Sequence, residues 1–89
     1  MSIDQRYLYQ CHQYFNAVIP ENPNYREQVG TVLFPFIEQI IGHKAPKVTG
    51  MLIDLPIEDI KQIMQDWNLF NTRVQQASEL LDAEMSQGA

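Results

Sequence analysis

Few side chains of this 89-residue chain could carry out chemistry, and those few are scattered. The single cysteine, Cys11, is followed by His12, and the other histidine, His43, lies far along the chain. Neighbouring residues of a helix point about 100° apart, so these three residues lack the usual spacing of a zinc site. We therefore expect no bound metal, and we interpret Cys11 as a buried thiol beside a surface imidazole.

Other kinds of catalytic group are also missing from the pattern. None of the serines has a nearby histidine that could activate it as a nucleophile. The four glycines are isolated from one another, so they form no glycine-rich phosphate loop. Glu58 and Asp59 fit a solvated first helical turn, where the helix dipole favours acids, better than an acid–base pair. The sequence therefore predicts neither an enzyme nor a cofactor.

Composition narrows the remaining classes of function. Hydrophobic residues make up 45% of the chain and charged residues 19%, which is typical of a folded domain. Six basic and eleven acidic residues give a net charge of −5, which disfavours direct binding to nucleic acid. The longest apolar run, residues 32–37, is too short to cross a bilayer. One cysteine excludes an internal disulfide and is compatible with a reducing compartment, so we expect a soluble intracellular domain.

Helical periodicity dominates the chain, and strand signals are nearly absent. Several residues mark predicted helix starts. Asn22 is expected to cap a helix with Pro23 at its first position, and Pro46 and Pro56 are expected to open two more. Asp66 is a suitable cap for a last, longer helix. These signals predict an all-α fold, a small bundle of five short helices plus an additional N-terminal helix.

Apolar stripes show which faces of these helices should be buried. The stripes are Leu8, Cys11, Phe15 and Val18 in the N-terminal helix and Phe70, Val74, Ala77 and Leu81 in the last one. Between them, one apolar face runs from Tyr25 to Ile41 and should end at Gly42. Pro35 lies inside that run and should kink or divide the helix, because it has no N–H to donate.

Gly50 is the unusual residue of the next helix, in the octet KVTGMLID of residues 47–54. A glycine in a helix interior costs about 0.5–1 kcal/mol relative to alanine, so something must offset it. Another helix could approach closely at that point, or a ligand side chain could need the space that a Cβ would fill. Lys47 and Asp54 share the face of Gly50, beside the core stripe of the same helix. Spacing alone leaves both explanations open.

Two blocks of sequence also resemble a known family, the MLLE domain. Residues 47–54 correspond to the family signature KITGMLLE, and residues 30–37, GTVLFPFI, correspond to its upstream block GERLFPLI. The spacing between the two blocks matches without a gap, and Arg73, Val74 and Ala77 match a further motif downstream. The MLLE domain is the C-terminal peptide-binding domain of cytoplasmic poly(A)-binding protein, and it also occurs in a HECT-type ubiquitin ligase and some RNA-transport proteins. The resemblance covers residues 30–81 and implies an MLLE-like domain, which we expect at 22–86. The additional N-terminal helix and linker predicted at 1–21 lie outside the resemblance, and residues 87–89 are expected to form a frayed tail.

The resemblance further implies that the chain binds a short linear peptide, the PABP-interacting motif, through a phenylalanine and a leucine anchor. The phenylalanine would stack on Phe34, with Gly30 and Gly50 giving it room and Lys47 and Thr49 at the rim. The leucine would lie between the helix around Gly50 and the last helix. There it would contact Met51, Leu52 and Ala77.

This resemblance carries expectations about partners. Lys47 would favour acidic peptides, and an interface of this size should bind at roughly micromolar strength. The chain would act as a cytoplasmic, monomeric adaptor in mRNA-associated assemblies. Thr31, Val32 and Glu27 depart from the family pattern, which leaves the exact peptide preference open.

Two alternatives remain at this point. The N-terminal helix either packs its stripe on the bundle, or forms a second contact surface or a cover over part of the groove. The chain could also be a structural module that self-associates through that aromatic helix. For Phe34, Met51 and Leu52, burial in the core is the alternative to contact with a peptide.

Overall fold

The computed structural model describes residues 2–19 and 21–87, with the backbone alone at residues 17 and 85–87. Within these ranges the chain forms helices and no strand. The elements are α1 (Ile3–Tyr14), η1 (Phe15–Ala17), α2 (Tyr25–Ile41), η2 (Gly42–Lys44), α3 (Ala45–Ile53), α4 (Ile57–Ile63) and α5 (Trp67–Gln87), where η marks a short 3-10 helix. The predicted all-α fold is confirmed.

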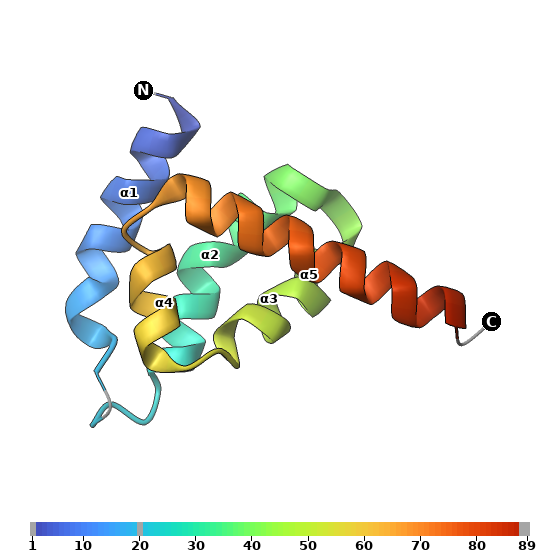
Figure 1. Ribbon diagram of the computed structural model, residues 1–89. Coiled ribbons are helices and arrows are strands. Elements are labelled where there is room, and N and C mark those ends of the chain that lie inside the picture. Colours follow the sequence, from blue (N-terminus) through green and yellow to red (C-terminus); the bar gives the residue numbers. More distant parts are fainter. Residues whose placement is uncertain (1, 20, 88–89) are drawn as a thin grey trace.

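Helix α2 is the central element of the bundle, because it packs against α1, α3 and α5. Helix α5 passes over the others, and its C-terminal turns project beyond them (Figure 1). The four residues of its predicted stripe, Phe70, Val74, Ala77 and Leu81, are all buried. The apolar period of this segment therefore predicted its buried face correctly.

Helix α1 is attached to the bundle through Tyr7, which is completely buried. Its ring stacks on Phe70 with centroids 4.3 Å apart and meets Phe36 edge-on at 5.2 Å. Its hydroxyl donates a hydrogen bond of 2.6 Å to the carbonyl of Ile63, at the end of α4. The last carbonyls of a helix lack intrahelical partners, so the phenol satisfies a group that the fold would otherwise leave buried and unpaired.

This contact rotates α1 slightly from the predicted orientation. Cys11 and Val18 are buried and Phe15 is half-buried, as the predicted stripe requires. Leu8 is 39% exposed, so its place in the stripe is wrong, and the neighbouring Tyr7 is buried instead. The reason is that only the tyrosine can both fill the aromatic cluster and reach the Ile63 carbonyl.

Most helix starts lie at or within one residue of the predicted positions, since α3 begins at Ala45 rather than Pro46 and α4 begins at Ile57, directly after Pro56. The side chain of Asp66 accepts hydrogen bonds from the backbone N–H of Asn68 and Leu69, at 3.0 and 3.2 Å, and so caps α5 as predicted. Gly42 ends α2 with a φ of 70°, a conformation that favours glycine. The predicted start of α2 at Pro23 is wrong.

Asn22 closes a turn before α2 rather than capping it. Its side-chain oxygen accepts a hydrogen bond of 3.1 Å from the N–H of Asn24, and the helix begins one residue later, at Tyr25. An asparagine side chain that accepts a hydrogen bond from the backbone N–H two residues later closes a turn of this kind.

Pro35 does not divide α2, which runs unbroken from Tyr25 to Ile41. The division of this segment was one source of the larger helix count predicted from the sequence. Pro35 and Thr31 both lie on the exposed face, so the carbonyl that loses its helical partner is on the solvent side. The buried face of the helix is therefore continuous.

At the C-terminus, Gln87 is the last residue of α5, and residues 88–89 of the predicted frayed tail lie outside the described residues. None of the described helices combines the length and the hydropathy that crossing a bilayer requires.

Candidate functional site

Side chains that could bind a metal ion do not gather in the described part of the chain. Within residues 2–19 and 21–87, no three His, Cys, Asp or Glu side chains are placed to hold a metal ion. Cys11 is a buried free thiol, as predicted. Burial raises its pKa to about 11, so the thiol keeps its proton at neutral pH.

The open space beside Gly50 is the feature that decides between the two explanations for this glycine. A Cβ built on Gly50 would have no atom of another helix within 4 Å. A neighbouring helix therefore does not require the glycine in the described structure. The surface of α3 is accessible at this point, so an incoming chain could approach its backbone closely.

Gly30, unlike Gly50, faces a neighbouring helix at close range. A Cβ at Gly30 would lie 3.6 Å from Cγ2 of Thr49 and 3.7 Å from Cγ2 of Ile53. Gly30 thus lies where α2 and α3 pack against each other. Arg26, one turn earlier, donates to the carbonyls of Ile53 and Leu55 and so ties α2 to the end of α3.

The three other residues predicted for the phenylalanine site differ in exposure. Phe34 is half-buried against the edge of the core, and Lys47 is exposed. Thr49 is only 8% exposed, and its hydroxyl donates a hydrogen bond of 2.6 Å to the carbonyl of Ala45. Its predicted place at a rim is therefore wrong, because the hydroxyl bonds back within α3 and the methyl group faces Gly30.

The residues predicted for the leucine site come together in one hollow between α3 and α5. Met51, Leu52 and Ala77 line it, and its volume is about 130 Å³. Four more residues complete the lining, namely Leu55, Arg73, Gln76 and Leu80.

Leu80 is the lining residue that the sequence analysis missed. It is 60% exposed, which makes it an apolar side chain presented to solvent. It follows Ala77 by three residues and so shares a face of α5 with it, and this spacing is the signal that could have identified it.

A second hollow, of about 260 Å³, lies beside the start of α3 and against Leu81 of α5. Its rim carries His43, Lys44 and Lys47. Lys44 forms an ion pair of 2.6 Å with Asp82, whereas the side chain of Lys47 has no hydrogen bond or ion pair with any described residue. Basic side chains therefore gather at one end of the α3–α5 face in a chain that is acidic overall.

The chain is similar to a known protein family over most of its length. The family model of the MLLE domain matches residues 20–81, more than half of the chain. The chain belongs to the MLLE family. Helices α2, α3 and α4 and most of α5 lie within the matched segment, and α1 lies outside it. MLLE domains are protein-interaction domains that bind peptide motifs of partner proteins.

A curated relative of this MLLE chain is polyadenylate-binding protein 2 of Arabidopsis thaliana. It is 30% identical over 64 residues, which are 72% of this chain and 10% of that protein. The chain thus spans about a tenth of the length of the relative. No solved structure matches the chain significantly.

Proposed function

We propose that this MLLE chain is a non-catalytic adaptor that binds a short linear peptide through one phenylalanine and one leucine anchor. Its setting would be a cytoplasmic mRNA-associated assembly, an inference that rests on the family and on the poly(A)-binding relative. The observation that carries the proposal is the open space beside Gly50. A helix-weakening glycine without a packing reason is expected where a ligand must approach the helix closely.

The leucine anchor would occupy the hollow between α3 and α5. The walls supplied by Met51, Leu52 and Leu80 are apolar, and the hollow is open to solvent beside the exposed Leu80. Burying a leucine side chain contributes about 1.5–3 kcal/mol, which is enough to make this contact one of the two main sources of affinity.

The phenylalanine anchor would enter on the other side of α3, between α2 and α3. Phe34 follows Gly30 by one turn on the side of α2 that faces α3, and its half-buried side chain would keep part of its ring available for an offset aromatic pair. Gly50 would let the peptide backbone cross α3 without meeting a side chain. The glycine therefore separates two anchor sites that one extended peptide can reach together.

Charge would add selectivity to these two apolar contacts. Lys47 has no partner among the described residues, and it lies beside His43 and Lys44. An acidic peptide would be attracted to this end of the face. With two anchors and little charge burial, we expect a dissociation constant of roughly micromolar order.

The test is a calorimetric titration of the 89-residue chain with a PABP-interacting-motif peptide that contains both anchors. We expect Phe34→Ala to weaken binding by at least about tenfold, or 1.4 kcal/mol, while the chain stays folded. Tyr9→Ala is the matched control, because Tyr9 is an exposed aromatic residue on α1. Equal affinity for the parent chain and Phe34→Ala would contradict the phenylalanine site.

The proposed adaptor is a monomer with an open groove. Light scattering at several concentrations distinguishes it from a module that self-associates through α1. A molecular mass that stays at one chain supports the proposal, and a mass that rises with concentration supports self-association.

A further inference from the structure

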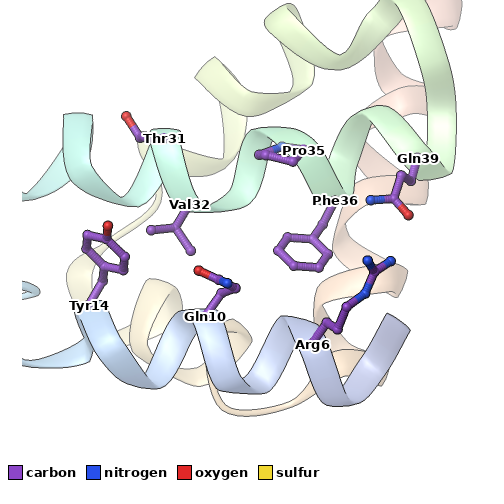
Figure 2. Close-up of a pocket in the computed structure, with 8 residues that line it drawn as sticks. All are labelled: Arg6, Gln10, Tyr14, Thr31, Val32, Pro35, Phe36 and Gln39. Atoms are coloured by element: carbon purple, nitrogen blue, oxygen red, sulfur yellow. The ribbon is translucent and has the colours of Figure 1, made fainter. Parts of the chain in front are cut away.

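A groove between α1 and α2 lies apart from the two proposed anchor sites, which together are called the MLLE site below. The groove has no role in the function proposed above. Its volume is about 350 Å³. Arg6, Gln10 and Tyr14 line it from α1, four residues apart (Figure 2). Val32 and Phe36 of α2 form its buried floor. One wall of the groove therefore lies outside the segment that matches the MLLE family.

The groove lies on the other side of α2 from the MLLE site. Gly30 faces α3, and Phe34 follows it by four residues on the same side of the helix. Val32 and Phe36 point instead toward α1 (Figure 2). A ligand can therefore occupy the groove whether or not a peptide is bound between α2 and α3.

The groove is positively charged, whereas the chain as a whole is negatively charged. Its lining contains one cation, Arg6, and no acidic residue, although the net charge of the chain is −5. The guanidinium of Arg6 points across the groove toward Gln39 (Figure 2). It forms no hydrogen bond or ion pair with any of the described residues. An arginine with free donors is suited to bind a carboxylate with two parallel hydrogen bonds.

The dimensions and the polar groups of the groove fit a short extended peptide. Arg6 and Tyr14 are eight residues apart on α1, which corresponds to about 12 Å. At about 3.3 Å per residue, that length accommodates three or four residues of extended chain. The side-chain amides of Gln10 and Gln39 each offer both donors and an acceptor, as a peptide backbone requires.

We propose that the groove between α1 and α2 binds a three- or four-residue extended segment of a partner protein. A carboxylate of the segment pairs with Arg6 and Gln39. An apolar side chain of the segment lies over Val32 and Phe36, toward Tyr14. A polyanion such as nucleic acid does not fit, because it needs several cations and the groove has one.

The test is a titration of the isotope-labelled 89-residue chain, followed by backbone amide shifts. The probes are acetyl-Leu-Ala-Glu-amide and acetyl-Glu-Ala-Leu-amide at millimolar concentration, so that both chain directions are sampled. We expect saturable shifts in residues 6–14 and 31–39 with at least one probe. Replacing Glu by Gln in that probe should weaken binding about threefold, as for an exposed ion pair.

Two variants separate the groove from the MLLE site. Arg6→Gln should lower affinity for the Glu probe about threefold and abolish the difference between the Glu and Gln probes. Arg73→Gln, in the hollow between α3 and α5, should change neither. The proposal is overturned if neither Glu probe shifts residues 6–14 and 31–39, or if the Glu and Gln probes bind equally. Either result leaves binding of the two-anchor peptide, and hence the proposed function, untouched.

Discussion

Replacing Gly50 tests the central physical claim, because stability and binding should change in opposite directions. In Gly50→Ala the new methyl group would meet no atom of another helix within 4 Å. The folded chain therefore gains helix propensity without a clash. The same methyl group intrudes on the space through which a peptide would approach α3.

The size of the stability change follows from helix propensity. Alanine in a helix interior is more favourable than glycine by about 0.5–1 kcal/mol, so Gly50→Ala should raise the free energy of unfolding by that amount. For a chain of this length, 1 kcal/mol corresponds to about 4–8 °C in Tm. Thermal unfolding followed by circular dichroism resolves such a shift. Gly50→Leu should also fold, and it should abolish binding of the two-anchor peptide in calorimetry.

Gly30 supplies the matched control. A leucine at Gly30 would extend from a Cβ that already lies 3.6 Å from Thr49 and 3.7 Å from Ile53, so Gly30→Leu should destabilise the packing of α2 on α3. If Gly50→Ala lowers Tm, the space beside Gly50 is filled and the reasoning fails. If Gly50→Leu is stable but binds the peptide as well as the parent chain does, the peptide does not cross α3 there.

Two further predictions concern the core around α1. Tyr7→Phe keeps the ring cluster but leaves the Ile63 carbonyl without its buried donor. It should therefore lower the free energy of unfolding, measured in urea, by about 1–3 kcal/mol. The control Tyr9→Phe, at an exposed position, should change that free energy by less than about 0.5 kcal/mol. Burial raises the pKa of Cys11 from 9.0 to about 11, so the unfolded chain loses this proton first and the free energy of unfolding should fall as pH rises between these values. In Cys11→Ala that part of the alkaline fall should be missing, and a fall of equal size would contradict the assignment.

Local rules predicted much of the fold. The apolar period of α5, the cap at Asp66 and the glycine end of α2 depend on residues close in the sequence, and all three were correct. The choice between Tyr7 and Leu8 as the buried residue of α1 could not be made in this way. It depends on a carbonyl 56 residues further along the chain, and periodicity carries no information on such a partner.

The candidate site could be predicted from the sequence only in part. The family resemblance placed the leucine site between the helices now seen as α3 and α5. In the structure, Met51, Leu52 and Ala77 line one hollow at that position. The reason for Gly50 remained open, since spacing along one helix does not tell where other helices pass. The burial of Thr49 was missed for the same reason, because it depends on the position of Gly30 in the opposite helix.

Helix α1 belongs to the folded unit even though the MLLE match does not include it. Tyr7 and Cys11 have no exposed surface, and the ring of Tyr7 touches aromatic residues of both α2 and α5. A chain of 89 residues buries a limited apolar surface, so the loss of one such ring removes a large share of its core. The contacts of Tyr7 also hold α1 against α2, which keeps both walls of the groove between them in place. The periodicity did not place Tyr7 in the buried stripe, yet the proposed groove between α1 and α2 depends on this residue.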